Sequence, residues 1–143
     1  MSSELFKILY CSRNFIGGGP AQNDAEISQI LATARANNSR QSVTGALLFN
    51  SGCFAQVLEG PRTAIEQIFE RIQRDPRHGD VTVLESGSAA RRDFPEWSMA
   101  HVQPPSGAQA TGVAATLDQA LSHPENSGRE VLELLRNLVV QED

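Results

Sequence analysis

Apolar and polar positions alternate along several short segments of the chain, and a two-residue period is typical of β-strands. The segments lie between stretches rich in glycine, proline or asparagine, which favour turns. The predicted strands are residues 5–12, 42–49, 53–58 and 80–85, with a shorter fifth at 97–102.

Two segments between these strands instead repeat apolar residues every three or four positions, as one face of a helix does. The first helix is predicted to begin at Asn23 or Asp24, either of which can cap it, and to end near Asn37–Asn38. The second begins after Gly60–Pro61 and ends at Asp75–Pro76. The apolar positions that define the two faces are Ile27, Ile30, Leu31 and Ala34, and then Ala64, Ile65, Ile68, Phe69 and Ile72.

The resulting order, β-α-β-β-α-β-β, predicts an α+β fold of the ferredoxin-like type, with a mixed five-stranded sheet and both helices on one face. Residues 114–122 and 127–140 are predicted as two further helices, which would cover the other face of the sheet. We therefore expect a domain at 1–102 and a C-terminal helical extension at 103–143 that packs on the sheet.

Composition narrows the class of protein. The 143 residues suit one compact domain, and the net charge of −5 argues against a general nucleic-acid or membrane binder, because both partners are anionic. No apolar run approaches the ~20 residues that span a bilayer. Two cysteines are too few for a disulfide scaffold, so we expect a cytoplasmic protein with reduced thiols.

Two polar side chains fall on faces that should be buried. Tyr10 shares a strand face with Phe6 and Ile8, and Gln56 shares one with Phe54 and Leu58. A buried amide without partners costs roughly 1–3 kcal/mol, so each group needs a partner. The first and third strands of a ferredoxin-like sheet are neighbours, which would bring Tyr10 and Gln56 side by side on the helix-covered face. They either satisfy each other or form part of a site.

Asn37–Asn38 would add two more amides near the same face, although asparagine is also an ordinary residue at a helix end. Three amides and a phenol around an apolar slot suit a planar ligand with polar edges. Other candidates are weaker from the residues alone. Arg71 and Asp75 are typical of solvent-exposed charges on the second helix, and His78 is typical of a surface residue just after its end. The histidines and cysteines form no metal-ligand set.

Alternative functions remain at this point. An acylphosphatase-type enzyme has a ferredoxin-like fold and needs an arginine and a phosphate-binding loop after the first strand, to which Arg13 and Gly17–Gly19 correspond weakly. An RNA-binding sheet would need a basic balance and exposed aromatic residues, which this chain lacks.

Five segments, taken in order, resemble the BLUF family of bacterial blue-light sensors that use FAD. Each is a weak signal alone, but the order and spacing of all five agree over residues 5 to about 102. The segments are Leu9–Arg13, Asn37–Asn38 with Val43–Leu48, Phe54–Pro61, Asp75–His78 and Arg92–Met99.

The resemblance implies roles for individual residues. Tyr10 is similar to the tyrosine that donates an electron and a proton to the excited flavin, and Gln56 to the glutamine that links this tyrosine to the flavin ring. Trp97 and Met99 resemble the fifth-strand pair whose environment changes on signalling. The implied FAD-binding residues are Tyr10, Ile30, Ala34, Asn37, Asn38, Phe54, Gln56, Arg71, Ile72, Asp75 and His78.

The implied function is that of a photoreceptor with non-covalently bound FAD and no catalysis of its own. Light would drive Tyr10-to-flavin electron and proton transfer and rearrange the hydrogen bonds of Gln56. No effector domain follows in the sequence, so we expect the signal to pass through a homo-oligomer, a dimer or larger, or through a separate downstream protein.

Overall fold

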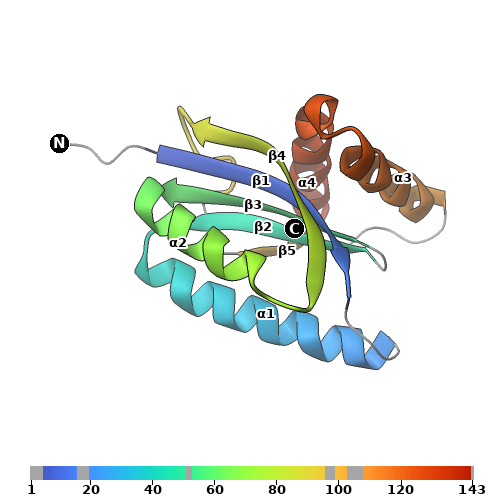
Figure 1. Ribbon diagram of the computed structural model, residues 1–143, viewed down its shortest axis with the longest axis horizontal. Helices are drawn as coiled ribbons and strands as arrows, with labels where there is room; N and C mark the ends of the chain where they lie inside the picture. Colours follow the sequence, from blue (N-terminus) through green and yellow to red (C-terminus); the bar gives the residue numbers. More distant parts are fainter. Residues whose placement is uncertain (1–4, 16–19, 51–52, 96–98, 103–107, 143) are drawn as a thin grey trace.

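A computed structural model describes residues 5–15, 20–50, 53–95, 99–102 and 108–142. Its centre is one twisted sheet with strand order β4-β1-β3-β2-β5 (Figure 1). The four longer strands pair antiparallel, and the short β5 lies parallel to β2 at one edge. The strands are β1 (Leu5–Asn14), β2 (Thr44–Asn50), β3 (Cys53–Pro61), β4 (His78–Ser88) and β5 (Ala100–Val102).

Helices cover both faces of this sheet. Two long helices, α1 (Pro20–Arg40) and α2 (Arg62–Gln73), lie on one face, and α3 (Ala108–Ser122) and α4 (Gly128–Glu142) lie on the other (Figure 1). A single 3₁₀ turn, η1 (Pro124–Asn126), joins the last two. The predicted α+β class is confirmed. Among the described residues, no helix is both long and apolar enough to cross a lipid bilayer.

Helix α1 is longer at both ends than the sequence predicts. It begins at Pro20, not at Asn23 or Asp24, and continues to Arg40. Its end is set by Ser42, which has a φ of 60°, in the left-handed region that usually favours glycine. The main-chain N–H of Val43 then donates to the carbonyl of Asn38 at 2.9 Å, which satisfies an end carbonyl of the helix. Asn37 and Asn38 therefore lie within the helix rather than capping it.

Strand β4 is also longer than predicted, because its pairing with β1 runs from His78, opposite Asn14, to Ser88, opposite Phe6. Two irregularities interrupt this register, between Leu9 and Tyr10 and between Cys11 and Arg13. The predicted strand at 97–102 is observed as β5 over its last three residues, while residues 97 and 98 lie outside the described part of the chain.

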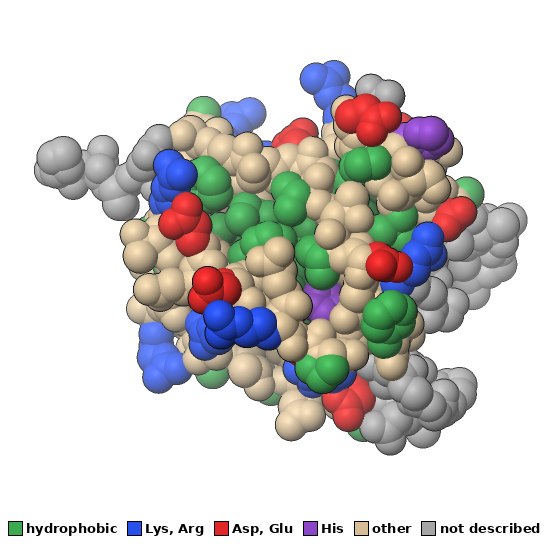
Figure 2. Space-filling view, viewed as in Figure 1, with side chains coloured by type: hydrophobic (Ala, Val, Ile, Leu, Met, Phe, Trp, Pro, Cys, Tyr) green, Lys and Arg blue, Asp and Glu red, His purple; other side chains and the backbone are tan. Residues whose placement is uncertain are grey.

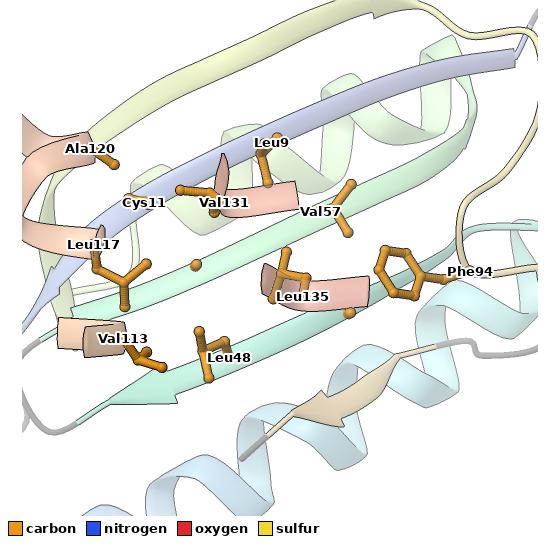
Figure 3. Close-up of a cluster of buried hydrophobic side chains, with 12 residues drawn as sticks. Leu9, Cys11, Leu48, Val57, Phe94, Val113, Leu117, Ala120, Val131 and Leu135 are labelled. Carbon is orange, nitrogen blue, oxygen red and sulfur yellow. The ribbon is translucent and has the colours of Figure 1, made fainter. Parts of the chain in front are cut away.

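The face of the sheet that carries α3 and α4 forms one apolar core. Leu9 and Val57 project from the sheet and meet Leu117 of α3 and Val131 and Leu135 of α4 (Figure 3). All five are fully buried. Cys11 lies in the same core as a free thiol, and burial raises its pKa to about 12, so it stays protonated.

A buried carboxylate fixes the chain between β4 and β5. Glu59 of β3 is fully buried and accepts hydrogen bonds from the main-chain N–H groups of Asp93 and Phe94. The hydroxyl of Thr44 donates to it at 3.1 Å and itself accepts from Arg92 at 2.8 Å. Arg92 also donates to the carbonyls of Glu59 and Ser42. Residues 92–94 are thus fastened to the start of β2 and the end of β3.

Replacing Glu59 with alanine should lower the free energy of unfolding by about 3 kcal/mol, because one buried and one partly buried N–H group lose a charged acceptor. Glu66→Ala is the matched control: its carboxylate is 55% exposed and pairs with Arg62 on the same helix, a contact worth about 0.5 kcal/mol or less. Urea unfolding of both variants measures the difference. Equal losses would contradict the anchoring role of Glu59.

Candidate functional site

Tyr10 and Gln56 are directly opposite each other in the antiparallel pairing of β1 and β3. Both are buried, with 3% and 5% of their surfaces exposed, and the Tyr10 hydroxyl donates a hydrogen bond to the Gln56 amide oxygen, Oε1. The pair faces α1 and α2, in a cluster that includes Leu31 of α1 and Ile65 of α2. The predicted contact between Tyr10 and Gln56 is present in the structure.

A cavity of about 190 Å³ opens beside this pair, between α1, α2 and the sheet. Figure 2 shows hydrophobic side chains gathered in the middle of this face, with charged side chains around them. All eleven residues that the resemblance implied for flavin binding line this one cavity, together with five others. The additional lining residues are Thr33, Leu47, Leu58, Ile68 and Arg77.

The phenol of Tyr10 is held in its neutral form. Burial raises its pKa well above the ordinary value, and the nearby Cys11 and Asp75 raise it further. Its ring packs against Phe69, with centroids 5.5 Å apart. Tyr10 can therefore donate its proton in a hydrogen bond but does not ionise at any physiological pH.

The amide nitrogen of Gln56 is poorly satisfied. Its contact among the described residues is the sulfur of Met99 at 3.5 Å, and a thioether is a weak acceptor. Among the described residues, neither of the two amide N–H groups thus has a strong acceptor, which is costly unless another group supplies one. Because Gln56 lines the cavity, a ligand with a carbonyl edge fits this position.

The two asparagines reach the cavity from the last turns of α1. Asn38 is 2% exposed, and its main-chain carbonyl closes the helix end. The half-buried Asn37 accepts a hydrogen bond from Arg40 at its side-chain oxygen, at 2.7 Å. Their amides would meet the polar edge of a planar ligand, while Ala34 and Ile30, one and two turns earlier, supply its apolar wall.

His78 bridges three elements at the other end of the cavity. The carbonyl of Ile72 can only accept, so ring nitrogen Nε2 carries a hydrogen and donates to it at 2.7 Å. The other ring nitrogen, Nδ1, lies 2.7 Å from the hydroxyl of Ser12, which is fully buried. The rings of Phe54 and His78 pack edge to face, with centroids 5.9 Å apart. Sequence reasoning from the residue alone placed His78 at the surface and did not single out Ser12.

Charged groups border the mouth of the cavity. Arg77 makes a bidentate contact with Asp75 and pairs with Glu26 of α1 at 3.2 Å, while Arg71 is exposed on α2. The hydrogen bond from Arg77 is the main reason that the pKa of Asp75 is lowered, and it outweighs the opposing effect of burial. The pKa of Arg77 is raised in turn. Arg77 was missed from the sequence because only the fold brings it to Glu26.

Of the two residues predicted to carry the output signal, the structure describes Met99 but not Trp97. Met99 is 1% exposed, and its sulfur meets Gln56. Its main-chain carbonyl accepts a hydrogen bond from Arg35 of α1 at 2.9 Å. Trp97 lies outside the described residues.

Other predicted chemistry is not brought to this cavity. Arg13 pairs with Asp80 at 3.5 Å and Asp118 at 3.9 Å, and Asp118 belongs to α3, on the opposite face of the sheet. The arginine of an acylphosphatase-type site therefore points away, and Gly17–Gly19 lie outside the described residues. The part of the chain that the structure describes contains no cluster of His, Cys, Asp and Glu suited to a metal ion.

Comparison with known proteins gives one consistent family. A family model described as sensors of blue-light using FAD, BLUF, matches residues 5–100. The photoactivated adenylate cyclase subunit beta of Euglena gracilis is 43% identical over 75 residues, which is 52% of this chain and 9% of that protein. The blue light- and temperature-regulated antirepressor BluF of Escherichia coli strain K12 is 38% identical over 69 residues, 48% of this chain and 17% of that protein.

These alignments span less than a fifth of each curated relative. A solved structure matches over nearly the whole chain instead. BlrB, a BLUF protein in its dark state, is 32% identical, covers 99% of both chains and superposes with a TM-score of 0.74. The similarity to BlrB therefore includes α3 and α4 as well as the sheet and the cavity helices.

The Asp75–Arg77 contact should make stability depend on pH in the acid range. Because the pKa of Asp75 is lower in the folded chain than in the unfolded chain, its stabilisation is present above about pH 4 and is lost as the pH falls through the folded value. Asp75→Asn should therefore be less stable than the unmodified protein at pH 7, by a difference that shrinks below pH 4. Solvent screening weakens the attraction between Asp75 and Arg77, because both side chains are partly exposed, so the expected stability difference is small.

Urea unfolding between pH 7 and pH 3 measures this difference. Asp118→Asn serves as the control, because Asp118 is 70% exposed and its contact with Arg13 is long, at 3.9 Å, so the pair should contribute little to stability. A destabilisation by Asp75→Asn that is equal at pH 7 and pH 3 would contradict the assignment.

Proposed function

Because this chain belongs to the BLUF family of blue-light sensors, we propose that it is a blue-light photoreceptor that binds FAD non-covalently in the cavity between α1, α2 and the sheet. The observation that carries the proposal is the buried pair in which the Tyr10 hydroxyl donates to Gln56, whose amide nitrogen contacts, among the described residues, the sulfur of Met99. The matched family is one of sensors, and we propose no catalysis for this chain.

The residues present fit a flavin ring. An isoalloxazine has flat apolar faces and a polar edge of carbonyl and ring nitrogen atoms, so it needs an apolar slot with amides at one side. Ile30, Ala34 and Ile72 supply the slot, and Gln56 and Asn38 supply amides. In this proposal, Asn37 lies beside Asn38 at the ring edge, Phe54 packs on the ring, and Arg71, Asp75 and His78 lie near its edge and side chain.

A bound flavin would supply absorption of blue light and, once excited, an electron acceptor. Tyr10 is then the electron donor. Its neutral phenol becomes strongly acidic when it loses an electron, and its hydrogen bond to Oε1 of Gln56 gives the proton a route. Tyr10 thus couples electron loss to proton transfer without prior ionisation.

Gln56 converts this transfer into a change of hydrogen bonding. Its amide has an acceptor at Oε1 and donors at Nε2. If Oε1 takes the Tyr10 proton and one Nε2 hydrogen passes as a proton to the bound ligand that accepted the electron, Gln56 would become the imidic tautomer, and return of that electron and a proton from the ligand would restore the Tyr10 phenol. Rotation about Cγ–Cδ would instead exchange the two ends of the amide. Either change alters which group faces the cavity and which faces Met99, so the absorption shifts without any covalent bond to the chromophore.

The output of this change is proposed to be the region of Met99 and Trp97. Because the Gln56 amide nitrogen meets the Met99 sulfur, a reoriented amide would withdraw its donor from Met99. Met99 immediately precedes β5, so its displacement would perturb the edge of the sheet. This is a local change that biases a two-state element.

We propose a cytoplasmic protein in which residues 1–102 form the flavin-binding domain and residues 103–143 form a helical extension. The signal would pass to a homo-oligomer contact or to a separate downstream protein. The Euglena gracilis and Escherichia coli relatives, by their names, are a cyclase subunit and an antirepressor, so both enzymatic and regulatory outputs occur beside similar domains.

Protein purified from a flavin-replete host should be yellow, and blue light should shift its absorption slightly to the red, with recovery in darkness. Gln56→Ala should retain the flavin and reduce the shift to less than about a tenth, since the reorienting amide is gone. Tyr10→Phe should likewise retain the flavin and lose the shift, because it has no phenol to donate a proton.

Gln67→Ala is the matched control, since Gln67 is exposed on α2, and it should leave the shift unchanged. Absorption spectra before, during and after illumination provide the measurement. A colourless protein, or a full shift in Gln56→Ala, would refute the proposed function.

A further inference from the structure

Met99 makes hydrogen bonds at two atoms, its sulfur and its main-chain carbonyl, and the proposed function involves the sulfur contact alone. The sulfur lies 3.5 Å from the Gln56 amide nitrogen, whereas the main-chain carbonyl accepts a hydrogen bond from Nε of Arg35 at 2.9 Å. Hydrogen bonds from a guanidinium are among the stronger kinds, and those to a thioether are among the weaker. Of these two contacts, Arg35 therefore provides the firmer hold on Met99.

Arg35 lies on the part of α1 that also lines the cavity. Ala34 precedes it, and Asn38 is three residues further on, close to it on the helix surface. Arg35 itself is exposed, apart from the contact that reaches the Met99 carbonyl. One turn of α1 thus contacts both the proposed ligand site and the residue next to β5.

We propose that Arg35 is a positioning residue that holds Met99 in front of Gln56 and thereby selects the amide orientation of the dark state. With the carbonyl of Met99 fixed, its sulfur meets Nε2, and Oε1 is left to accept from Tyr10. The light-dependent part of this inference rests on the proposed function, while the coupling of Arg35 to Met99 does not.

Residues 92–94, at the start of the segment that leads to Met99, are held by contacts that do not depend on Arg35. Residues 92–94 are fastened by Glu59 and by the guanidinium of Arg92, and Phe94 is buried in the core beside α4. These contacts fix the start of the segment that leads to β5 and do not involve Met99. Loss of Arg35 should therefore release Met99 while leaving the start of this segment in place.

The sequence offers a direct probe, because it contains only two methionines, Met1 and Met99. Protein labelled with ¹³C at the methionine methyl groups should give two methyl NMR signals, of which Met99→Leu identifies one. In flavin-free protein, Arg35→Ala should shift or broaden the Met99 signal. Arg35→Lys, which keeps a cationic donor, should restore at least half of the wild-type position.

Arg62→Ala is the control, because Arg62 is an exposed arginine on α2 that pairs with Glu66 and not with Met99. A Met99 signal that Arg35→Ala leaves within its wild-type line width would overturn the proposal. So would an equal displacement in Arg62→Ala, which would show a general effect of losing a surface charge.

A second measurement uses the flavin-loaded protein. Arg35→Ala should retain the flavin but show about half or less of the wild-type light-induced absorption shift, because its Gln56 already samples the other orientation in darkness. A full-sized shift would overturn the link from Arg35 to Gln56. If the wild-type protein shows no shift, the proposed function fails, and the methyl spectra of flavin-free protein still decide whether Arg35 positions Met99.

Discussion

The antiparallel pairing of β1 with β3 is the constraint on which the site depends, because it sets Tyr10 directly opposite Gln56. A shift of this register by one residue would turn either side chain to the opposite face of the sheet. The apolar residues on both faces oppose such a shift: Ile8 and Leu58 pack beneath α1 and α2, while Leu9 and Val57 pack beneath α3 and α4. The core therefore specifies the geometry of the hydrogen bond between the phenol and the amide.

The two faces of the sheet serve different purposes. The face beneath α3 and α4 is closely packed with apolar side chains, and the face beneath α1 and α2 leaves a cavity. Polar groups that line the cavity make contacts of their own, Tyr10 with Gln56 and His78 with the buried Ser12 behind it, yet the Gln56 amide nitrogen remains poorly satisfied. Such a site is rigid where it is packed and polar where a ligand must be recognised, which is the usual division in small-molecule sites.

Much of this arrangement could be predicted from the sequence, because its periodicity is strong. The alternation in β1 and β3 gave the inward faces of Tyr10 and Gln56, and the ferredoxin-like order gave their proximity. Element ends were less predictable: α1 runs past Asn37–Asn38 because Ser42 adopts a left-handed conformation, which residue type alone does not indicate. The contacts of Arg77 with Glu26 and of Arg35 with Met99 join segments that are far apart in the chain, so no local sequence pattern predicts them.

Strand β3 carries the Gln56 amide on one face and, three residues later, the Glu59 anchor on the other, and both side chains are buried. Because side chains alternate along a strand, the three-residue spacing is what places Gln56 and Glu59 on opposite faces of the sheet. Inserting or deleting one residue between Gln56 and Glu59 would send one of them into the wrong layer. The length of β3 between Gln56 and Glu59 is therefore constrained by the two layers on either side of the sheet.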